Sequence, residues 1–111
     1  MRLVIGVQEA QVVVEVAGDL DSAGARLLRR ALDREGPTPS RILVDITDVP
    51  FVDSAGIAAL IGLARRARER GTDVEIRGAR RSVARVLALT GVDQFVPVAA
   101  APDGALPAGA R

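Results

Sequence analysis

Few residue types in this chain could carry out covalent chemistry. Its 111 residues contain no histidine and no cysteine, and all fifteen basic residues are arginine, so lysine is absent too. These absences remove the commonest general base, thiolate nucleophiles, thiolate metal ligands and Schiff-base lysines. Serine hydroxyls and carboxylates remain. The composition therefore favours a binding or regulatory protein over an enzyme, and no catalytic residue is expected.

The most informative stretch runs from Asp45 to Ile57, with the sequence Asp-Ile-Thr-Asp-Val-Pro-Phe-Val-Asp-Ser-Ala-Gly-Ile. It is predicted to pass from a buried strand through a loop into a helix. Asp53 and Ser54 fall where the first backbone N–H groups of a helix lack partners. Because both types are favoured caps, one of the two is expected to accept a hydrogen bond there. Gly56, like Gly62 further along, is expected to permit close packing of this helix.

Ser54 could in addition carry a phosphate. A hydroxyl at a helix N-terminus lies in a positive local potential that tolerates an anion. Phosphorylation adds a charge of about −1.5 to −2, here on the surface and not in the core. Of the four serines, Ser54 is the predicted acceptor. Ser22 is expected to cap the first helix, Ser40 lies in a proline loop, and Ser82 is expected to start the third helix.

Other candidate sites are weaker. Asp19 and Asp21 flank a turn, but no third ligand lies nearby, so they are interpreted as turn residues and neither a metal nor a cofactor is expected. Asp45 could match the phospho-aspartate of a receiver domain, which also needs a lysine that this chain lacks. The arginines at 65–70 complement a helix C-terminus, and no aromatic residue lies among them. Nucleic-acid binding is therefore not expected.

Hydrophobic periodicity predicts alternating strands and helices. The helical spacing of Ile57, Leu60, Ile61 and Ala64 places these residues on one face of the second helix, and Leu60 is expected to face the core. Strands are predicted over 3–7, 12–16, 41–46, 74–76 and 95–98, with helices over 22–34, from Asp53–Ser54 to Gly71, and from Ser82 to Gly91. The first two strands form a hairpin, and the later ones follow parallel crossovers. The uninterrupted apolar run 42–44 predicts a strand covered on both faces. The expected fold is α/β: a mixed four- to five-stranded sheet with an antiparallel N-terminal edge strand and three to four covering helices.

The chain is predicted to form one domain over residues 1–99, followed by a disordered Ala/Pro/Gly tail over 100–111. We identify no internal repeat. No apolar run approaches the ~20 residues of a transmembrane helix, and the N-terminus does not resemble a signal peptide. A cytoplasmic protein without membrane contacts is therefore expected.

Four segments together resemble the STAS domain, and in particular the stand-alone anti-sigma factor antagonists of bacteria. Their spacing and element order match over roughly residues 3–99. The segments are Gly18-Asp19-Leu20-Asp21, Asp45, Phe51-Val52-Asp53-Ser54-Ala55-Gly56, and Leu89-Thr90-Gly91-Val92-Asp93-Gln94-Phe95.

This resemblance implies a partner-switching cycle. The unphosphorylated protein binds an anti-sigma factor that is also a serine kinase, which releases a sigma factor. The kinase then phosphorylates Ser54 and the complex dissociates, until a PP2C-type phosphatase restores the antagonist, which is expected to be a monomer. Ala55 replaces a second serine that is frequent in the family and leaves Ser54 as the acceptor. The residues implied in partner binding are Asp19, Asp21, Ser22, Asp53, Ser54, Ala55 and Gly56.

An alternative within the same family stays open. The chain could be a STAS subunit of a transport ATPase of the lipid-trafficking type, or a stressosome-like scaffold component. The gene neighbourhood would separate these functions, since a kinase or sigma-factor gene supports the first and a permease–ATPase operon the second.

Overall fold

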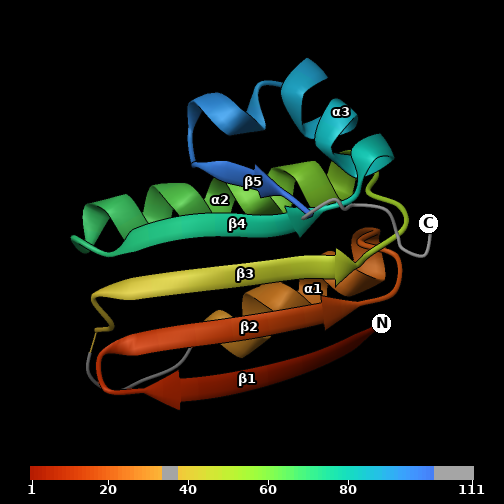
Figure 1. Ribbon diagram of the computed structural model, residues 1–111. Coiled ribbons are helices and arrows are strands. Elements are labelled where there is room, and N and C mark those ends of the chain that lie inside the picture. The colour runs from red at the N-terminus through yellow and green to blue at the C-terminus, as the bar shows by residue number, and fades with distance from the viewer. Residues whose placement is uncertain (34–37, 102–111) are drawn as a thin grey trace.

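The computed structural model describes residues 1–33 and 38–101 (Figure 1). Strands and helices alternate along the chain after an initial hairpin. Their order is β1 (Arg2–Gln8), β2 (Gln11–Ala17), α1 (Ser22–Leu32), β3 (Arg41–Asp48), α2 (Ser54–Glu69), β4 (Asp73–Ala79), α3 (Arg81–Leu89), the 3₁₀ helix η1 (Val92–Gln94) and β5 (Val98–Ala100).

The five strands form one sheet in the order β1-β2-β3-β4-β5. Strand β1 is antiparallel to β2, and the other three pairs are parallel. This confirms the predicted mixed sheet with an antiparallel N-terminal edge. Each parallel connection contains a helix, so the chain returns to the same end of the sheet before every new parallel strand (Figure 1).

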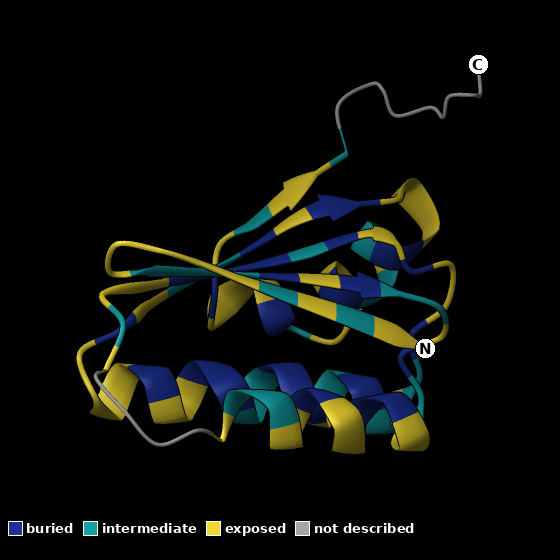
Figure 2. Ribbon diagram, turned by 90° about the horizontal axis from the view of Figure 1, so that it is seen from below, coloured by how far each residue is buried: buried dark blue, intermediate teal, exposed yellow. Residues whose placement is uncertain are grey.

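Helices α1 and α2 lie together on one face of the sheet (Figure 2). The apolar run 42–44 is buried on both faces of the strand as predicted, although no helix within residues 1–33 and 38–101 lies over the opposite face of β1–β3. The reason is the sequential strand order, because right-handed crossovers that all advance in one direction place their helices on one side. Leu43 points to the open face, between Val13 and Glu75 in the register, and is nevertheless only 5% exposed.

The core between sheet and helices is aliphatic. Both phenylalanines are substantially exposed, Phe51 at 52% and Phe95 at 40%. Leu60 of α2 is 1% exposed, which confirms the core-facing position predicted from its spacing. The fully buried side chains that fill the core include Val14, Leu28, Val44, Ile46, Leu60, Ile76, Val83 and Leu87.

Two predicted boundaries need correction. Helix α1 ends at Leu32, two residues before the predicted end at 34, a residue that lies outside the described ones. Phe95 and Val96 do not belong to the last strand, because their N–H groups donate to the carbonyl of Val92 in a tight turn. Strand β5 begins only after Pro97 and includes Ala100, the first residue of the predicted tail. The rest of that tail, 102–111, lies outside the described residues.

The predicted helix stops at Gly71 and Gly91 are confirmed. Their φ angles are +74° and +82°, and this left-handed conformation suits a residue without a side chain. Gly71 ends the last turn of α2, and Gly91 separates α3 from η1.

Candidate functional site

Two loops at the carboxyl end of the sheet lie side by side. Leu20, after β2, forms an isolated parallel bridge with Val52, after β3. The N–H of Leu20 donates to the carbonyl of Phe51 over 2.9 Å, and the N–H of Asp53 donates to the carbonyl of Leu20 over 3.3 Å. The turn at 19–22 and the start of α2 therefore form one continuous surface.

An aspartate caps each of the two helices that begin here. Oδ1 of Asp53 accepts a hydrogen bond from the N–H of Gly56 at 3.0 Å, and Oδ1 of Asp21 accepts one from Gly24 at 3.0 Å. Of the two residues proposed as the cap of α2, the structure selects Asp53. The prediction that Ser22 caps α1 is wrong, because Asp21 stands one residue earlier with extended backbone and its carboxylate reaches the third helical N–H.

We expect the loss of a capping aspartate to destabilise the protein more than the loss of the serine beside it. Asp21→Ala should lower the free energy of unfolding by about 0.5–2 kcal/mol, because the N–H of Gly24 loses its acceptor. Ser22→Ala should change it by less than about 0.5 kcal/mol, since the hydroxyl is exposed and caps nothing. Urea denaturation of both variants checks this, and equal losses would contradict the assignment of Asp21 as the cap.

Ser54 is exposed and is the first residue of α2. Asp53 occupies the N–H of Gly56, which leaves the N–H groups of Ser54 and Ala55 directed out of the helix N-terminus. No hydrogen bond within the described part of the chain engages the Ser54 hydroxyl. The side chain is therefore free for modification and lies in the positive field of the helix end.

Gly56 is required by a close approach of backbone. A Cβ atom placed on it would lie less than 3.0 Å from the carbonyl oxygen of Leu20 in the neighbouring loop. The expected close packing at Gly56 is confirmed, although the contact is this loop. The same expectation for Gly62 is wrong, because a Cβ there would meet only the Arg66 guanidinium, at 3.6 Å.

Asp45 lies within β3, three residues before the strand ends at Asp48. Its Oδ1 accepts hydrogen bonds from the N–H and hydroxyl of Thr47, at 2.9 and 2.6 Å. Its Oδ2 lies 3.8 Å from Nε of Arg77. These contacts assign Asp45 to the structure of the strand end. Among residues 1–33 and 38–101, no three acidic side chains are grouped so that they could hold a metal ion.

Phe51 lies beside the candidate site, although the sequence analysis did not include it among the residues implied in partner binding. Its ring is 52% exposed, whereas the flanking Val49 and Val52 are at most 6% exposed. It stands three residues before Ser54, and its carbonyl joins the two loops. Exposed aromatic side chains are enriched among the residues that dominate protein interfaces. The sequence does contain a signal for this exposed position, because Phe51 directly follows Pro50 and fits no strand or helix periodicity.

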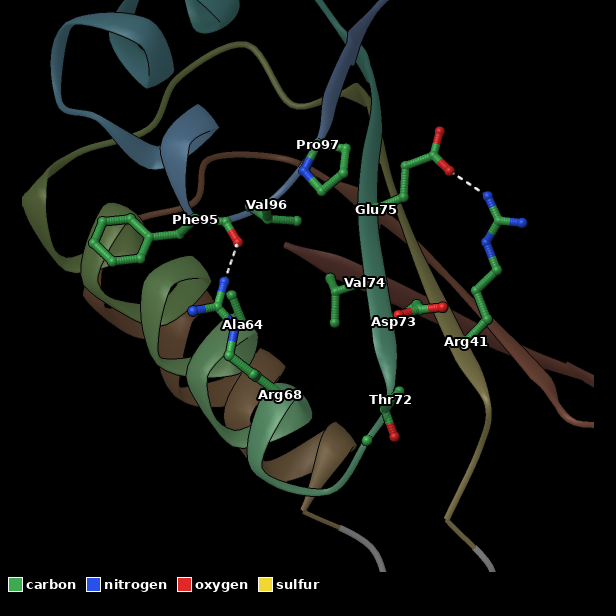
Figure 3. A pocket seen from close by; sticks show the side chains of 11 residues that line it. Arg41, Ala64, Arg68, Thr72, Asp73, Val74, Glu75, Phe95, Val96 and Pro97 are labelled. Atoms are coloured by element: carbon green, nitrogen blue, oxygen red, sulfur yellow. Dashed lines mark hydrogen bonds and ion pairs between the residues drawn. The ribbon is translucent and has the colours of Figure 1, made fainter.

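Two hollows of the surface lie at the other end of α2. One of about 490 Å³ is bordered by the end of α2 and the start of β4 (Figure 3). There Arg68 donates to the carbonyl of Phe95 at 3.4 Å, and Arg41 pairs with Glu75. A second, of about 400 Å³, adjoins Leu63 and Arg70 on its other side. No residue of the two capped turns lines either hollow.

No helix in the described portion of the chain combines the length and apolar character needed to cross a membrane.

Known proteins resemble this chain over nearly its whole length. The chain is 24% identical over 111 residues to the "Anti-sigma-F factor antagonist RsfA" of Mycobacterium tuberculosis, covering 97% of this chain and 87% of that protein. The structure of the anti-sigma factor antagonist SpoIIAA in its unphosphorylated form superposes with a TM-score of 0.76 at 17% identity, covering 92% and 91% of the two chains. The STAS domain of a SulP transporter from Vibrio cholerae gives 0.73 at 27% identity, covering 94% and 84%.

A family model described as "Mlab, STAS domain" matches residues 4–97. This match spans both capped turns, most of β1 and all of β2, β3 and β4. Together with the mixed sheet and its antiparallel edge, it confirms the resemblance found in the sequence, and the chain belongs to the STAS domain family.

Proposed function

We propose that this protein is an anti-sigma factor antagonist, in which the unphosphorylated chain binds an anti-sigma factor with serine kinase activity. Phosphorylation of Ser54 switches that binding off, and a PP2C-type phosphatase reverses it, in the cytoplasm. The observation that carries the proposal is an exposed Ser54 at the start of α2, beside the turn at 19–22. Support comes from a relative named as an antagonist that aligns over 97% of this chain.

The switch has an electrostatic basis. A phosphate on Ser54 adds a charge of about −1.5 to −2 next to the carboxylates of Asp21 and Asp53. Those carboxylates are held in place by their capping bonds and cannot rotate away without uncapping a helix. A partner surface packed against a neutral hydroxyl would then bury an unpaired charge, which is costly. The fold itself tolerates the phosphate because the side chain is exposed and the helix N-terminus favours an anion.

Titration calorimetry against the partner anti-sigma factor tests this proposal. Ser54→Ala should bind like the wild type and lose the release that phosphorylation of Ser54 causes when the kinase is supplied with ATP. Ser54→Asp should bind at least about tenfold more weakly, a penalty of ~1.4 kcal/mol.

Ser82→Asp is the matched control, since it places the same charge at an exposed residue in the first turn of α3. It should leave the affinity unchanged. Equal affinities for Ser54→Ala and Ser54→Asp, with both variants folded by circular dichroism, would show that charge at Ser54 is not the switch.

A second candidate is a STAS subunit of a transport complex. The 27% identity to the STAS domain of the Vibrio cholerae SulP transporter supports it. Such a subunit would co-purify with its transport ATPase. Titration with an anti-sigma factor would then detect no binding for the wild type or for Ser54→Asp.

A further inference from the structure

The tetrapeptide Asp-Ser-Ala-Gly occurs twice, at residues 21–24 and 53–56. The conclusion that the chain has no internal repeat is therefore wrong at this short length. Both copies follow a buried aliphatic residue, Leu20 in one case and Val52 in the other. These two residues form the parallel bridge that joins the loops. The copies are thus neighbours in space as well as identical in sequence.

The two copies also share their local geometry. Each aspartate caps the N–H of its glycine at 3.0 Å, with φ of −105° at Asp21 and −104° at Asp53. Both glycines lie close to backbone of a neighbouring residue. A Cβ on Gly24 would lie 2.8 Å from the carbonyl oxygen of Asp19, and a Cβ on Gly56 would crowd the carbonyl oxygen of Leu20. Both helices begin at the same end of the sheet and pack against each other (Figure 1).

In both copies the serine is the first helical residue and is exposed. Ser22 therefore presents its hydroxyl in the setting that Ser54 has: a capping aspartate before it, an alanine after it, and a helix N-terminus beneath it. The reason for dismissing Ser22 as an acceptor was that it would be engaged as a cap, and the structure removes that reason.

We propose that Ser22 is a second phosphoacceptor, modified by the same kinase that acts on Ser54. This inference rests on the proposed function. In the reaction, Oγ of Ser22 attacks the γ-phosphorus of ATP, the bond from that phosphorus to the bridging oxygen of ADP breaks, and ADP leaves. The hydroxyl proton passes to a base on the kinase. The kinase meets one surface that presents two acceptors, each preceded by a capping aspartate.

The surroundings of the two serines set their order. Three residues before the serine stands Asp19 in one copy and the exposed Phe51 in the other. The extra carboxylate disfavours an approaching triphosphate, so Ser54 reacts faster. Each phosphate carries a charge of about −1.5 to −2, and the two serines stand on adjacent turns, each two residues beyond the bridged pair Leu20 and Val52. Because like charges on adjacent turns repel, molecules with one phosphate dominate over molecules with two.

The test uses four full-length proteins: wild type, Ser22→Ala, Ser54→Ala and the double variant. Each is incubated with ATP and, in turn, with every anti-sigma factor kinase encoded in the same genome, and is then digested with trypsin. Since the chain lacks lysine, the four serines fall on four different peptides, which are 3–26 for Ser22, 35–41 for Ser40, 42–65 for Ser54 and 82–85 for Ser82. Peptides 3–26 and 82–85 contain no threonine, so a phosphate on either lies on its serine. Fragmentation separates Ser54 from Thr47 on 42–65 and Ser40 from Thr38 on 35–41.

We expect Ser54→Ala to be phosphorylated on peptide 3–26 at a rate within about tenfold of the wild-type rate, and the double variant to stay unmodified. Ser82 is an internal control, because it is exposed in the first turn of α3 but follows Arg80, which makes no side-chain capping bond. Phosphate on peptide 82–85 at a comparable rate would overturn the inference, since exposure at a helix start would then suffice.

The remaining outcomes separate this inference from the proposed function. Phosphate on 42–65 in the wild type with an unmodified Ser54→Ala protein would overturn the role of Ser22 and leave the function of Ser54 intact. Wild-type protein left unmodified by every kinase would overturn both.

Discussion

Replacing Gly56 with alanine is expected to destabilise the domain by about 3 kcal/mol, the upper end of the range for overpacking. The added Cβ would fall inside contact distance of the Leu20 carbonyl, which is backbone and cannot swing aside like a side chain. Relief requires the β2–α1 loop to move away from α2. That movement would break the hydrogen bonds through which Leu20 holds Phe51 and Asp53. Urea denaturation of the purified variant measures the loss.

Gly62→Ala is the matched control for this prediction, because it makes the same change in the same helix. A Cβ at Gly62 meets only the flexible Arg66 side chain, so no strain opposes the substitution. Alanine in a helix interior is favoured over glycine by roughly 0.5–1 kcal/mol, and this variant should therefore be more stable than the wild type. If both variants changed the free energy of unfolding in the same direction, the close approach of Gly56 to the Leu20 carbonyl would not explain the effect of Gly56→Ala.

Truncation of Leu60 is the second large effect. Leu60→Ala should cost about 2–5 kcal/mol, because the side chain is 1% exposed and its removal leaves a cavity as well as losing buried apolar surface. Its neighbours in the core come from both the sheet and the helices, so the cavity cannot be closed by moving one element. Arg65→Ala, on the exposed side of α2, should change stability by less than about 0.5 kcal/mol. Chemical denaturation of the pair checks the orientation of α2, and a comparable effect at both positions would contradict it.

These predictions concern the surface proposed for the switch as much as the core. Gly56 allows the turn at 19–22 to lie against α2, and Leu60 fixes α2 on the sheet one turn further along. A variant that separates the two capped turns should weaken partner binding even where Ser54 is intact. Gly56→Ala, studied at a temperature where it remains folded, would show this in the calorimetric titration.

The sequence by itself determined the order of the elements and the residues that face the core. Leu60 and the glycines at 71 and 91 were placed correctly, because spacing along a helix and the left-handed conformation of a helix stop are local properties. The resemblance to STAS domains also came from sequence alone, since its motifs occur in the loops between correctly predicted elements. The hairpin and the parallel strands then implied the mixed sheet that the structure has.

Only the tertiary structure decided which residues cap the helices and which face of the sheet is covered. Aspartate and serine are both good caps, and which of two adjacent residues holds the N–H depends on where the backbone turns as it leaves the sheet. An apolar strand looks the same in sequence whether one or two layers cover it. The juxtaposition of the two Asp-Ser-Ala-Gly turns was invisible to sequence patterns, because β2 and β3 bring the turns together only by pairing in parallel, and pairing is a long-range contact that no local pattern encodes.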